Sequence, residues 1–352
     1  MSHFAGSDAA STSQEAAVNG TPYVNTVLGP VCADQLGPAA VHEALLSVVP
    51  GAEYAPDISM DRSEIFDTLA DKLADFHRHG GRTIVDSTGM FHGRDLRLYE
   101  ALSRSTGVHI IASTGMGPEE MLGGYFLTPQ TNPPTPWPAE RFTDLFTKEV
   151  AGGMVVPRLE RRAAAGMVAT TAGRTGMTPT EESLFRGAAR TALATGVPLS
   201  IRFGADAMHD LDVVLDEGLP ADRVLVGGLD RSDAVQAGAA MDVARRGAYV
   251  ALDHAGLDDD ERFVDDRRRA DLVLELADAG FAGRILLSSS AIGVAKGQPG
   301  CERPFSYVLS TFMPFLESRG LGAADAKRIL SGNPRALLAV SSAVPAQAAP
   351  RA

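Results

Sequence analysis

The sequence predicts an α/β protein, and within that class a (β/α)8 TIM barrel formed by one domain over residues 23–342. Eight short segments are apolar throughout and rich in β-branched residues, amphipathic segments separate them, and glycines follow most of the amphipathic segments. Strands that are apolar on both faces are typical of a parallel sheet covered by helices. Eight of them alternating with helices favour a closed barrel. The alternative is an open doubly wound sheet, but no GxGxxG motif follows the first strand.

The expected strands are residues 40–43, 83–88, 109–114, 166–171, 198–203, 224–229, 248–253 and 284–289. The expected helices are residues 63–79, 95–105, a helix that begins after Thr178, and residues 232–246, 265–279 and 305–319. In the first helix, apolar residues recur at spacings of three and four and so share one face: Ile65, Leu69, Leu73 and Phe76. Thr178, followed by Pro179 and Glu181, is a helix start of the capping-box type.

Two long segments, residues 117–138 and 291–304, interrupt this alternation after the third and eighth strands. Both leave from the face of a barrel that carries chemistry, where long loops usually line or cover a pocket; the alternative is surface decoration. We expect a disordered N-terminal tail over residues 1–22, which are rich in Ser, Ala and Gly, and a flexible C-terminal tail over residues 343–352.

Composition narrows the class of partner. The chain carries 32 Lys and Arg against 44 Asp and Glu, with a net charge of −12, and no basic cluster interleaved with aromatics, so a nucleic-acid partner is not expected. No apolar run reaches the roughly 18 residues of a membrane helix. The two cysteines, Cys32 and Cys301, make no disulfide framework, which favours a reduced, cytoplasmic setting. The expected partner is a small-molecule ligand, for the strand-end residues described below.

The first expected strand ends in His42 and Glu43, where a barrel strand points into the mouth. Further short motifs follow in order over residues 24–340: Thr26-Val27-Leu28-Gly29-Pro30, Val85-Asp86-Ser87-Thr88, Gly93-Arg94-Asp95, Thr106-Gly107-Val108, Ser113-Thr114-Gly115, Gly173-Arg174, Met177-Thr178-Pro179, Glu181-Glu182, Gly196-Val197-Pro198, Gly227-Gly228-Leu229-Asp230-Arg231, Leu286-Leu287-Ser288 and Asn333-Pro334-Arg335. In these motifs the chain resembles the phosphotriesterase-like family of the amidohydrolase superfamily, whose members are binuclear metal hydrolases on a (β/α)8 barrel. The resemblance also implies a homodimer.

The resemblance implies a metal centre whose ligands are mostly replaced here. In the family, two divalent cations, usually zinc, are held by two histidines of the first strand, a carboxylated lysine, two further histidines and an aspartate. The corresponding positions in this chain are His42, Ala44, Ala169, Arg202, Gly228 and Ser290. Alanine and glycine offer no donor atom, and Arg202 adds a positive charge. No lysine lies between Glu149 and Lys296 to restore the missing ligand. We therefore expect no metal and no other cofactor.

Polar residues remain at the strand ends and can carry other chemistry. Arg202 can replace the lost cation as a binder of a carboxylate or phosphate, with Gly228 leaving room for it. His42, or His254 with Asp253, can then act as acid or base. The alternative for Arg202 is a pairing with Asp86 or Glu43 that fills the vacated volume. The candidate catalytic residues are His42, Arg202, Asp253 and His254, and the candidate substrate-binding residues are Glu43, Asp86, Arg202, Gly228, Asp230 and Ser290.

Three functions agree with these residues. The first is a metal-independent hydrolase, lyase or isomerase that acts on a small anionic or carbonyl-bearing molecule. The second is a non-catalytic binding or regulatory protein derived from the family. The third is an ordinary zinc-dependent phosphotriesterase or lactonase whose ligands lie at other positions. The fold alone does not choose between them.

Overall fold

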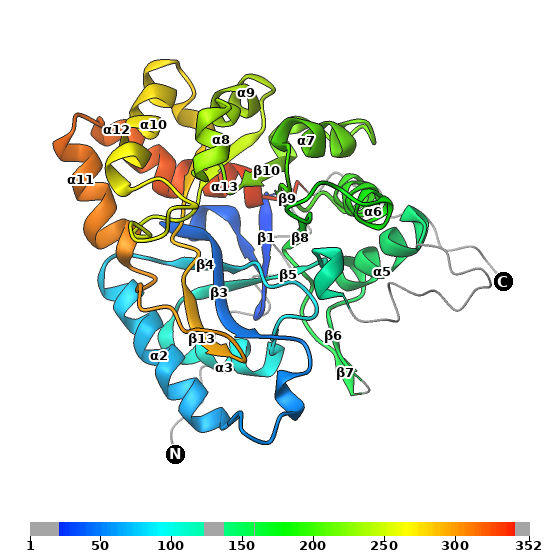
Figure 1. Cartoon of the computed structure of the whole chain (residues 1–352). Coiled ribbons are helices and arrows are strands. Elements are labelled where there is room, and N and C mark those ends of the chain that lie inside the picture. The colour runs from blue at the N-terminus through cyan, green and yellow to red at the C-terminus, as the bar shows by residue number, and fades with distance from the viewer. Residues whose placement is uncertain (1–20, 123–136, 158, 342–352) are drawn as a thin grey trace.

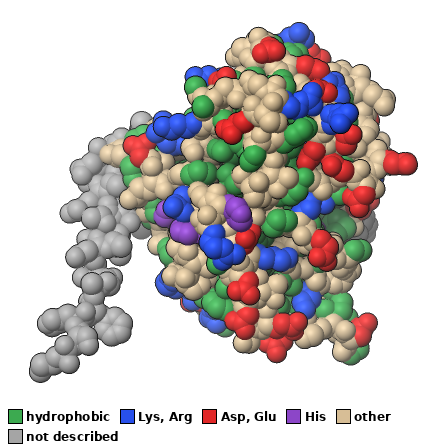
Figure 2. All heavy atoms as spheres, turned by 90° about the vertical axis from the view of Figure 1, so that its left-hand side faces the viewer, with side chains coloured by type: hydrophobic (Ala, Val, Ile, Leu, Met, Phe, Trp, Pro, Cys, Tyr) green, Lys and Arg blue, Asp and Glu red, His purple; other side chains and the backbone are tan. Residues whose placement is uncertain are grey.

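A computed structural model describes residues 21–122, 137–157 and 159–341. The expected C-terminal tail, nearly all of the expected N-terminal tail and residues 123–136 of the first long loop lie outside these ranges. None of the helices in the described ranges combines the length and hydropathy needed to cross a bilayer. Acidic and basic side chains are interspersed with apolar ones on the face drawn in Figure 2.

Nine strands form one parallel sheet that curls on itself, with helices on its outside (Figure 1). Their order in the sheet is β12 (Ile285–Leu287), β11 (Tyr249–Leu252), β10 (Val224–Gly227), β9 (Leu199–Arg202), β8 (Met167–Thr171), β5 (His109–Thr114), β4 (Thr83–Asp86), β3 (Ala39–Val48) and β13 (Ile292–Lys296). Every predicted strand overlaps one of the first eight in this order. The prediction of a (β/α)8 barrel is confirmed.

The helices that surround the sheet are α2 (Arg62–Arg78), α3 (Leu96–Thr106), α5 (Ala139–Ala151), α6 (Pro179–Thr195), α7 (Ala207–Leu215), α8 (Ser232–Gln236), α9 (Ala239–Arg245), α10 (Asp266–Asp278), α11 (Met313–Ser318), α12 (Ala323–Lys327) and α13 (Asn333–Leu338). Short helical turns are η1 (Ala33–Gln35), η2 (Ala52–Tyr54), η3 (Glu119–Met121), η4 (Ala221–Arg223), η5 (Ala282–Arg284) and the π-helical turns η6 (Val308–Phe312) and η7 (Arg328–Gly332). Two antiparallel hairpins complete the fold: β1 (Tyr23–Thr26) with β2 (Gly29–Cys32), and β6 (Val155–Val156) with β7 (Glu160–Arg161).

Helix starts follow the predicted chemistry. The apolar face of α2 is buried at all four predicted positions, and Asp61 caps its first turn. In α6 the Thr178 hydroxyl accepts a hydrogen bond from the Glu181 amide, and the Glu181 side chain accepts one from the Thr178 amide, both at 3.1 Å. The predicted capping box is therefore confirmed.

Four predicted segments differ from the structure. The first strand is longer than residues 40–43 and has an irregular register between Ala40 and Glu43. The expected loop 291–304 contains β13, which pairs with β3. The predicted helix 232–246 is two helices, because Gly238 takes a φ of 70° between them. The predicted helix 305–319 begins as the π-helical turn η6, because Pro314 has no N–H for the ordinary helical hydrogen bond.

Apolar side chains form two layers, one inside the barrel and one between the sheet and the helices. Along β4, Val85 belongs to the inner group and Ile84 to the outer one, as the alternation of side chains along a strand requires. The inner group also contains Val24 of the β1–β2 hairpin and Leu337 of α13. The two ends of the described chain therefore close the bottom of the barrel and leave its other end for a site.

Side chains close the barrel between its last strand, β12, and its first, β3. No ladder pairs these two strands within the described residues. The Ser288 hydroxyl instead accepts hydrogen bonds from the amides of Val41 and His42, both at 3.0 Å. In return, the Glu43 carboxyl accepts hydrogen bonds from the amides of Ser289 (3.0 Å) and Ala291 (2.5 Å). We call this reciprocal set the seam.

Burial in the seam changes the ionisation of Glu43. Its side chain is 2% exposed, and this burial raises the pKa of Glu43 to about 8, although the two amide donors and Arg303 oppose the rise. The folded protein therefore retains a proton on this carboxyl at pH values where the unfolded chain has lost it.

We predict that Ser288→Ala destabilises the fold by about 3 kcal/mol, because two buried amides lose their acceptor. Urea unfolding of the variant measures the change. Ser63→Ala, at an exposed position of α2, is the control and should change stability by less than about 0.5 kcal/mol. Equal stability of the Ser288 variant and the wild type would contradict the assigned role of this hydroxyl.

We predict a pH-dependent effect of Glu43→Gln. Because the folded pKa of Glu43 is about 8 against an ordinary 4.5, the stabilisation from its bound proton is present below pH 4.5 and is lost as pH rises to 8. Glutamine cannot ionise, and its NH₂ group faces one of the two amide donors. The variant should be about 1–2 kcal/mol less stable than wild type at pH 5. Because wild type loses up to about 1.4 kcal/mol per pH unit as pH rises, the difference should vanish and then reverse, so that the variant is the more stable protein at pH 8. Denaturant unfolding at pH 5, 6, 7 and 8, with exposed Glu317→Gln as control, measures this; parallel wild-type and Glu43→Gln curves refute it.

Candidate functional site

A cavity of about 230 Å³ lies at the carboxyl ends of the barrel strands. It is lined by His42, Glu43, Ala44, Ser47, Ser87, Thr88, His92, Met116, Gly117, Ala169, Thr171, Arg202, Ser290 and Ile292. Five of the six positions aligned with the family's metal ligands are in this set, so the motif alignment brings them to one place. A larger groove of about 750 Å³ lies on the outside of the barrel between α5 and α6, far from the strand ends.

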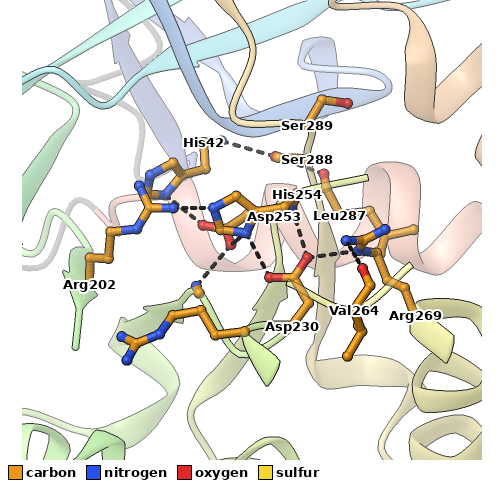
Figure 3. A network of polar contacts seen from close by, with 12 residues as sticks. His42, Arg202, Asp230, Asp253, His254, Val264, Arg269, Leu287, Ser288 and Ser289 are labelled. Carbon is orange, nitrogen blue, oxygen red and sulfur yellow. Dashed lines mark hydrogen bonds and ion pairs between the residues drawn. The ribbon is translucent and has the colours of Figure 1, made fainter. Parts of the chain in front are cut away.

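Arg202, at the end of β9, contacts His254, which follows β11 (Figure 3). Nη2 of the guanidinium lies against Nε2 of the imidazole. The other ring nitrogen, Nδ1, is 2.7 Å from Oδ1 of Asp230. A guanidinium only donates, so Nε2 accepts and Nδ1 carries the proton. Burial lowers the pKa of His254, but the carboxylates of Asp230 and Asp253 outweigh burial and raise it. Protonation of Nε2 and the contact with Arg202 exclude each other.

Asp230 is a fully buried carboxylate shared by two partners. Beyond its contact with Nδ1 of His254, its Oδ2 accepts a hydrogen bond from the His254 amide at 2.9 Å and one from Nε of Arg269 at 2.7 Å. Arg269 belongs to α10, is 0% exposed, and is also bonded to Asp266 and to the Val264 carbonyl. Burial raises the pKa of Asp230, but His254 and Arg269 outweigh it and hold the pKa below its usual range. Asp230 is therefore ionised and fixed.

His42 faces a second carboxylate, that of Asp253. Nδ1 of His42 is 3.3 Å from Oδ2 of Asp253, and neither atom has a hydrogen-bond partner within the described residues. Oδ1 of Asp253 accepts a hydrogen bond from the Gly228 amide at 2.8 Å. Burial, reinforced by Arg202, lowers the pKa of His42 to about 4 despite the opposing effect of Asp253. Burial opposes ionisation of Asp253 too, but His254 and His42 lower its pKa far below the usual range. A neutral imidazole thus lies beside an ionised carboxylate.

The other predicted site residues fall into two groups. Glu43 and Ser290 line the cavity, although the Glu43 carboxyl is engaged in the seam. Asp86 and Gly228 are not among the lining residues. The Asp86 carboxylate is fully buried and accepts hydrogen bonds from the Leu45 amide and from Tyr99. The side chain that Arg202 contacts is neither Asp86 nor Glu43 but the His254 ring, which the alternatives from sequence did not include.

Sequence reasoning did not find Arg269 or most of the cavity wall. Arg269 stands in a run of three arginines that reads as a solvated helix face, and only the docking of α10 shows that its side chain points inward. His92 lines the cavity from a loop, and burial lowers its pKa. Ser87 belongs to the Val85–Thr88 motif at the end of an expected strand, and this position is the sequence signal that could have indicated a cavity residue.

One group of acidic and histidine side chains in the described ranges has the spacing of a metal site. Ligand atoms of Asp230, Asp253 and His254 lie within 4.8 Å of one another, and all three residues are buried. The hydrogen bonds from His254 and Arg269 already occupy both oxygens of Asp230, and Arg202 lies against the remaining nitrogen of His254. Protein groups therefore already contact both oxygens of Asp230 and both ring nitrogens of His254, whereas Oδ2 of Asp253 has no hydrogen-bond partner in the described residues.

Comparisons with known proteins agree with this architecture. Residues 22–338 match the model of the phosphotriesterase family. The "Phosphotriesterase homology protein" of Mycobacterium tuberculosis is 24% identical over 327 residues, which cover 89% of this chain and 97% of the relative. The "Aryldialkylphosphatase" of Saccharolobus solfataricus is 26% identical over 287 residues, 78% of this chain and 86% of the relative. The "N-acetyltaurine hydrolase" of Danio rerio is 24% identical and covers 89% and 96%.

Solved structures show the same fold. A mutant of the PTE-like lactonase of Deinococcus radiodurans superposes with a TM-score of 0.80 at 23% identity, covering 90% of this chain and 99% of that chain. An engineered protein built on a promiscuous lactonase template superposes with a TM-score of 0.81 at 23% identity, with the same coverage. The family match spans nearly the whole barrel, from the β1–β2 hairpin to α13. The chain belongs to the phosphotriesterase family.

Proposed function

We propose that this chain is a metal-independent enzyme of hydrolase type that acts on a small anionic or carbonyl-bearing molecule. The observation that carries the proposal is the position of Arg202, whose guanidinium lies in the cavity beside His42 and His254. In this proposal it supplies the positive charge that the family obtains from two cations. The hydrolase relatives favour hydrolysis over the lyase and isomerase alternatives.

The donor set supports the absence of a binuclear centre. Ala44 and Ala169 line the cavity without a ligand atom, and Ser290 offers a neutral hydroxyl. A catalytic zinc normally keeps three protein ligands, whereas His42 is the one aligned position that retains a donor of the family type. Arg202 adds repulsion at short range in a partly buried site. The residues present therefore do not fit two zinc ions, and no step of the proposed reaction passes through metal.

Arg202 retains donors for a ligand. Of its five N–H groups, one is directed at Nε2 of His254, and the others have no partner in the described part of the chain. Neither Nε nor Nη1 is among the buried unpaired atoms, so both remain accessible from the cavity that Arg202 lines. A guanidinium fork with free donors matches a carboxylate, a phosphate or the developing oxyanion of an attacked carbonyl.

His42 has the properties of a general base. Its pKa of about 4 keeps the ring neutral at neutral pH, and Asp253 lies beside Nδ1. Since Nδ1 is buried, the 12% exposed fraction of this side chain lies elsewhere on the ring. In the proposed reaction, His42 takes a proton from a water molecule that attacks the substrate carbonyl, and Arg202 binds the resulting oxyanion. The oxyanion then collapses to a carbonyl, which breaks the bond from this carbon to the leaving group, and the leaving group takes the proton from His42.

The free Cys32 and Cys301 support a reducing, cytoplasmic setting for this enzyme.

The test combines metal removal with variants of Arg202. We predict that chelator-treated protein, shown by elemental analysis to carry no zinc, still hydrolyses one of a panel of lactones, esters, N-acyl amides and phosphotriesters. Arg202→Ala should lower kcat/KM at least 100-fold, because the oxyanion loses its charged partner, and Arg202→Lys should retain part of it. Arg104→Ala, at an exposed position of α3, is the matched control and should leave kcat/KM unchanged.

Two results contradict the proposal. About two zinc ions per chain, with activity lost on chelation, indicate an ordinary metal hydrolase of this family. Ligand binding without turnover of any substrate in the panel, by wild type as by Arg202→Ala, indicates a binding protein.

A further inference from the structure

Ser290 has a backbone conformation that side chains rarely adopt. Its φ is 44°, and no other non-glycine residue of the described ranges has a positive φ. A left-handed serine costs of order 1 kcal/mol or more, and such strain persists where the surroundings enforce it. Ser290 lies three residues beyond β12, and like the seam's Glu43 it lines the cavity.

The seam enforces this conformation. The Glu43 carboxyl binds the amides of Ser289 and Ala291, which are the residues on either side of Ser290. The amide of Ser290 between them makes no hydrogen bond to any residue that the structure describes. The Ser290 hydroxyl is buried and likewise has no partner there. Two unpaired donors at one residue are costly without a ligand to satisfy them.

The remaining wall of the cavity defines what that ligand can be. Among the described lining residues, Arg202 is the one with a permanent positive charge, so a single negative charge balances the site better than two. Its planar fork matches a carboxylate. The volume of about 230 Å³ is smaller than the roughly 300–1,000 Å³ of pockets for drug-sized ligands. Together these properties favour a small monocarboxylate.

We propose that Ser290 and Arg202 together bind the carboxylate of a small monocarboxylate, with the serine hydroxyl and amide on one side and the guanidinium on the other. The inference rests on the proposed function in placing the ligand in the same cavity, and it adds the substrate class and a second binding residue. The Ser290 hydroxyl is buried as the side chain lies, and it reaches the bound oxygen by rotation about χ1. The carboxylate then satisfies both unpaired donors of Ser290 and offsets the cost of its strained backbone.

Calorimetric titration of the full, metal-free chain tests the inference with three probes: propanoate, inorganic phosphate and propanamide. Propanoate should bind more tightly than the other two. Ser290→Ala should weaken propanoate about tenfold, since a hydrogen bond to a charged group is lost. Ser290→Gly removes the same hydroxyl while relaxing the backbone, so it should weaken propanoate as well and fold at least as stably as wild type. Ser289→Ala is the matched control: its hydroxyl is also buried and unpaired but does not line the cavity, so its affinity should equal that of wild type.

Equal propanoate affinity in wild type, Ser290→Ala and Ser290→Gly overturns the role of Ser290. Phosphate or propanamide binding as tightly as propanoate overturns the substrate class. Each result is separable from the proposed function: metal-free turnover with a Ser290-independent affinity removes only this inference. Propanoate binding that depends on Ser290, without any turnover, supports the inference and removes the proposed activity.

Discussion

The reciprocal exchange of hydrogen bonds between Glu43 and Ser288 is the constraint on which the rest of this barrel depends. The carboxyl of β3 satisfies two amides beyond β12, and the hydroxyl beyond β12 satisfies two amides of β3. These bonds join β12 to β3 where no ladder pairs the two strands, and a backbone ladder follows directly beyond them, where β13 pairs with β3. They also position the cavity, because His42 and Ser290 are neighbours in sequence of the residues that make them. The same hydrogen bonds therefore close the barrel and shape the cavity.

A chain of polar contacts runs from Arg202 in the cavity to the buried Arg269 in α10. The guanidinium of Arg202 meets the ring of His254, the ring meets Asp230, and Asp230 meets the buried guanidinium of Arg269. Asp253 lies between the two histidines. Arg269 is the charged partner of Asp230, and the charge of Arg202 favours ionisation of Asp253, so both buried carboxylates have a compensating cation. The arrangement keeps two carboxylates ionised beside a neutral His42.

Much of the fold could be predicted from the sequence, because the strand and helix signals are local. The apolar runs located all eight barrel strands, and Thr178 with Glu181 located the start of α6. The same periodicity could not show β13 within residues 291–304, because that strand is defined by its pairing with β3. In the site, the sequence indicated His42, Arg202 and His254 but not which of them touch. The sequence could not indicate Arg269, because its burial depends on how α10 packs against the barrel. Its partner Asp230 is 39 residues away in the sequence.

The side-chain closure of the barrel also has a consequence for its motions. The join between β12 and β3 consists of four hydrogen bonds made by two side chains. Directly beyond it the Ala44 amide donates to the Ala291 carbonyl, and β13 pairs with β3 as a backbone ladder. Separation of the two strands is therefore confined to a short stretch at the wall of the cavity. Local opening of these side-chain bonds would admit solvent and small solutes to the cavity while the ladder keeps the barrel closed.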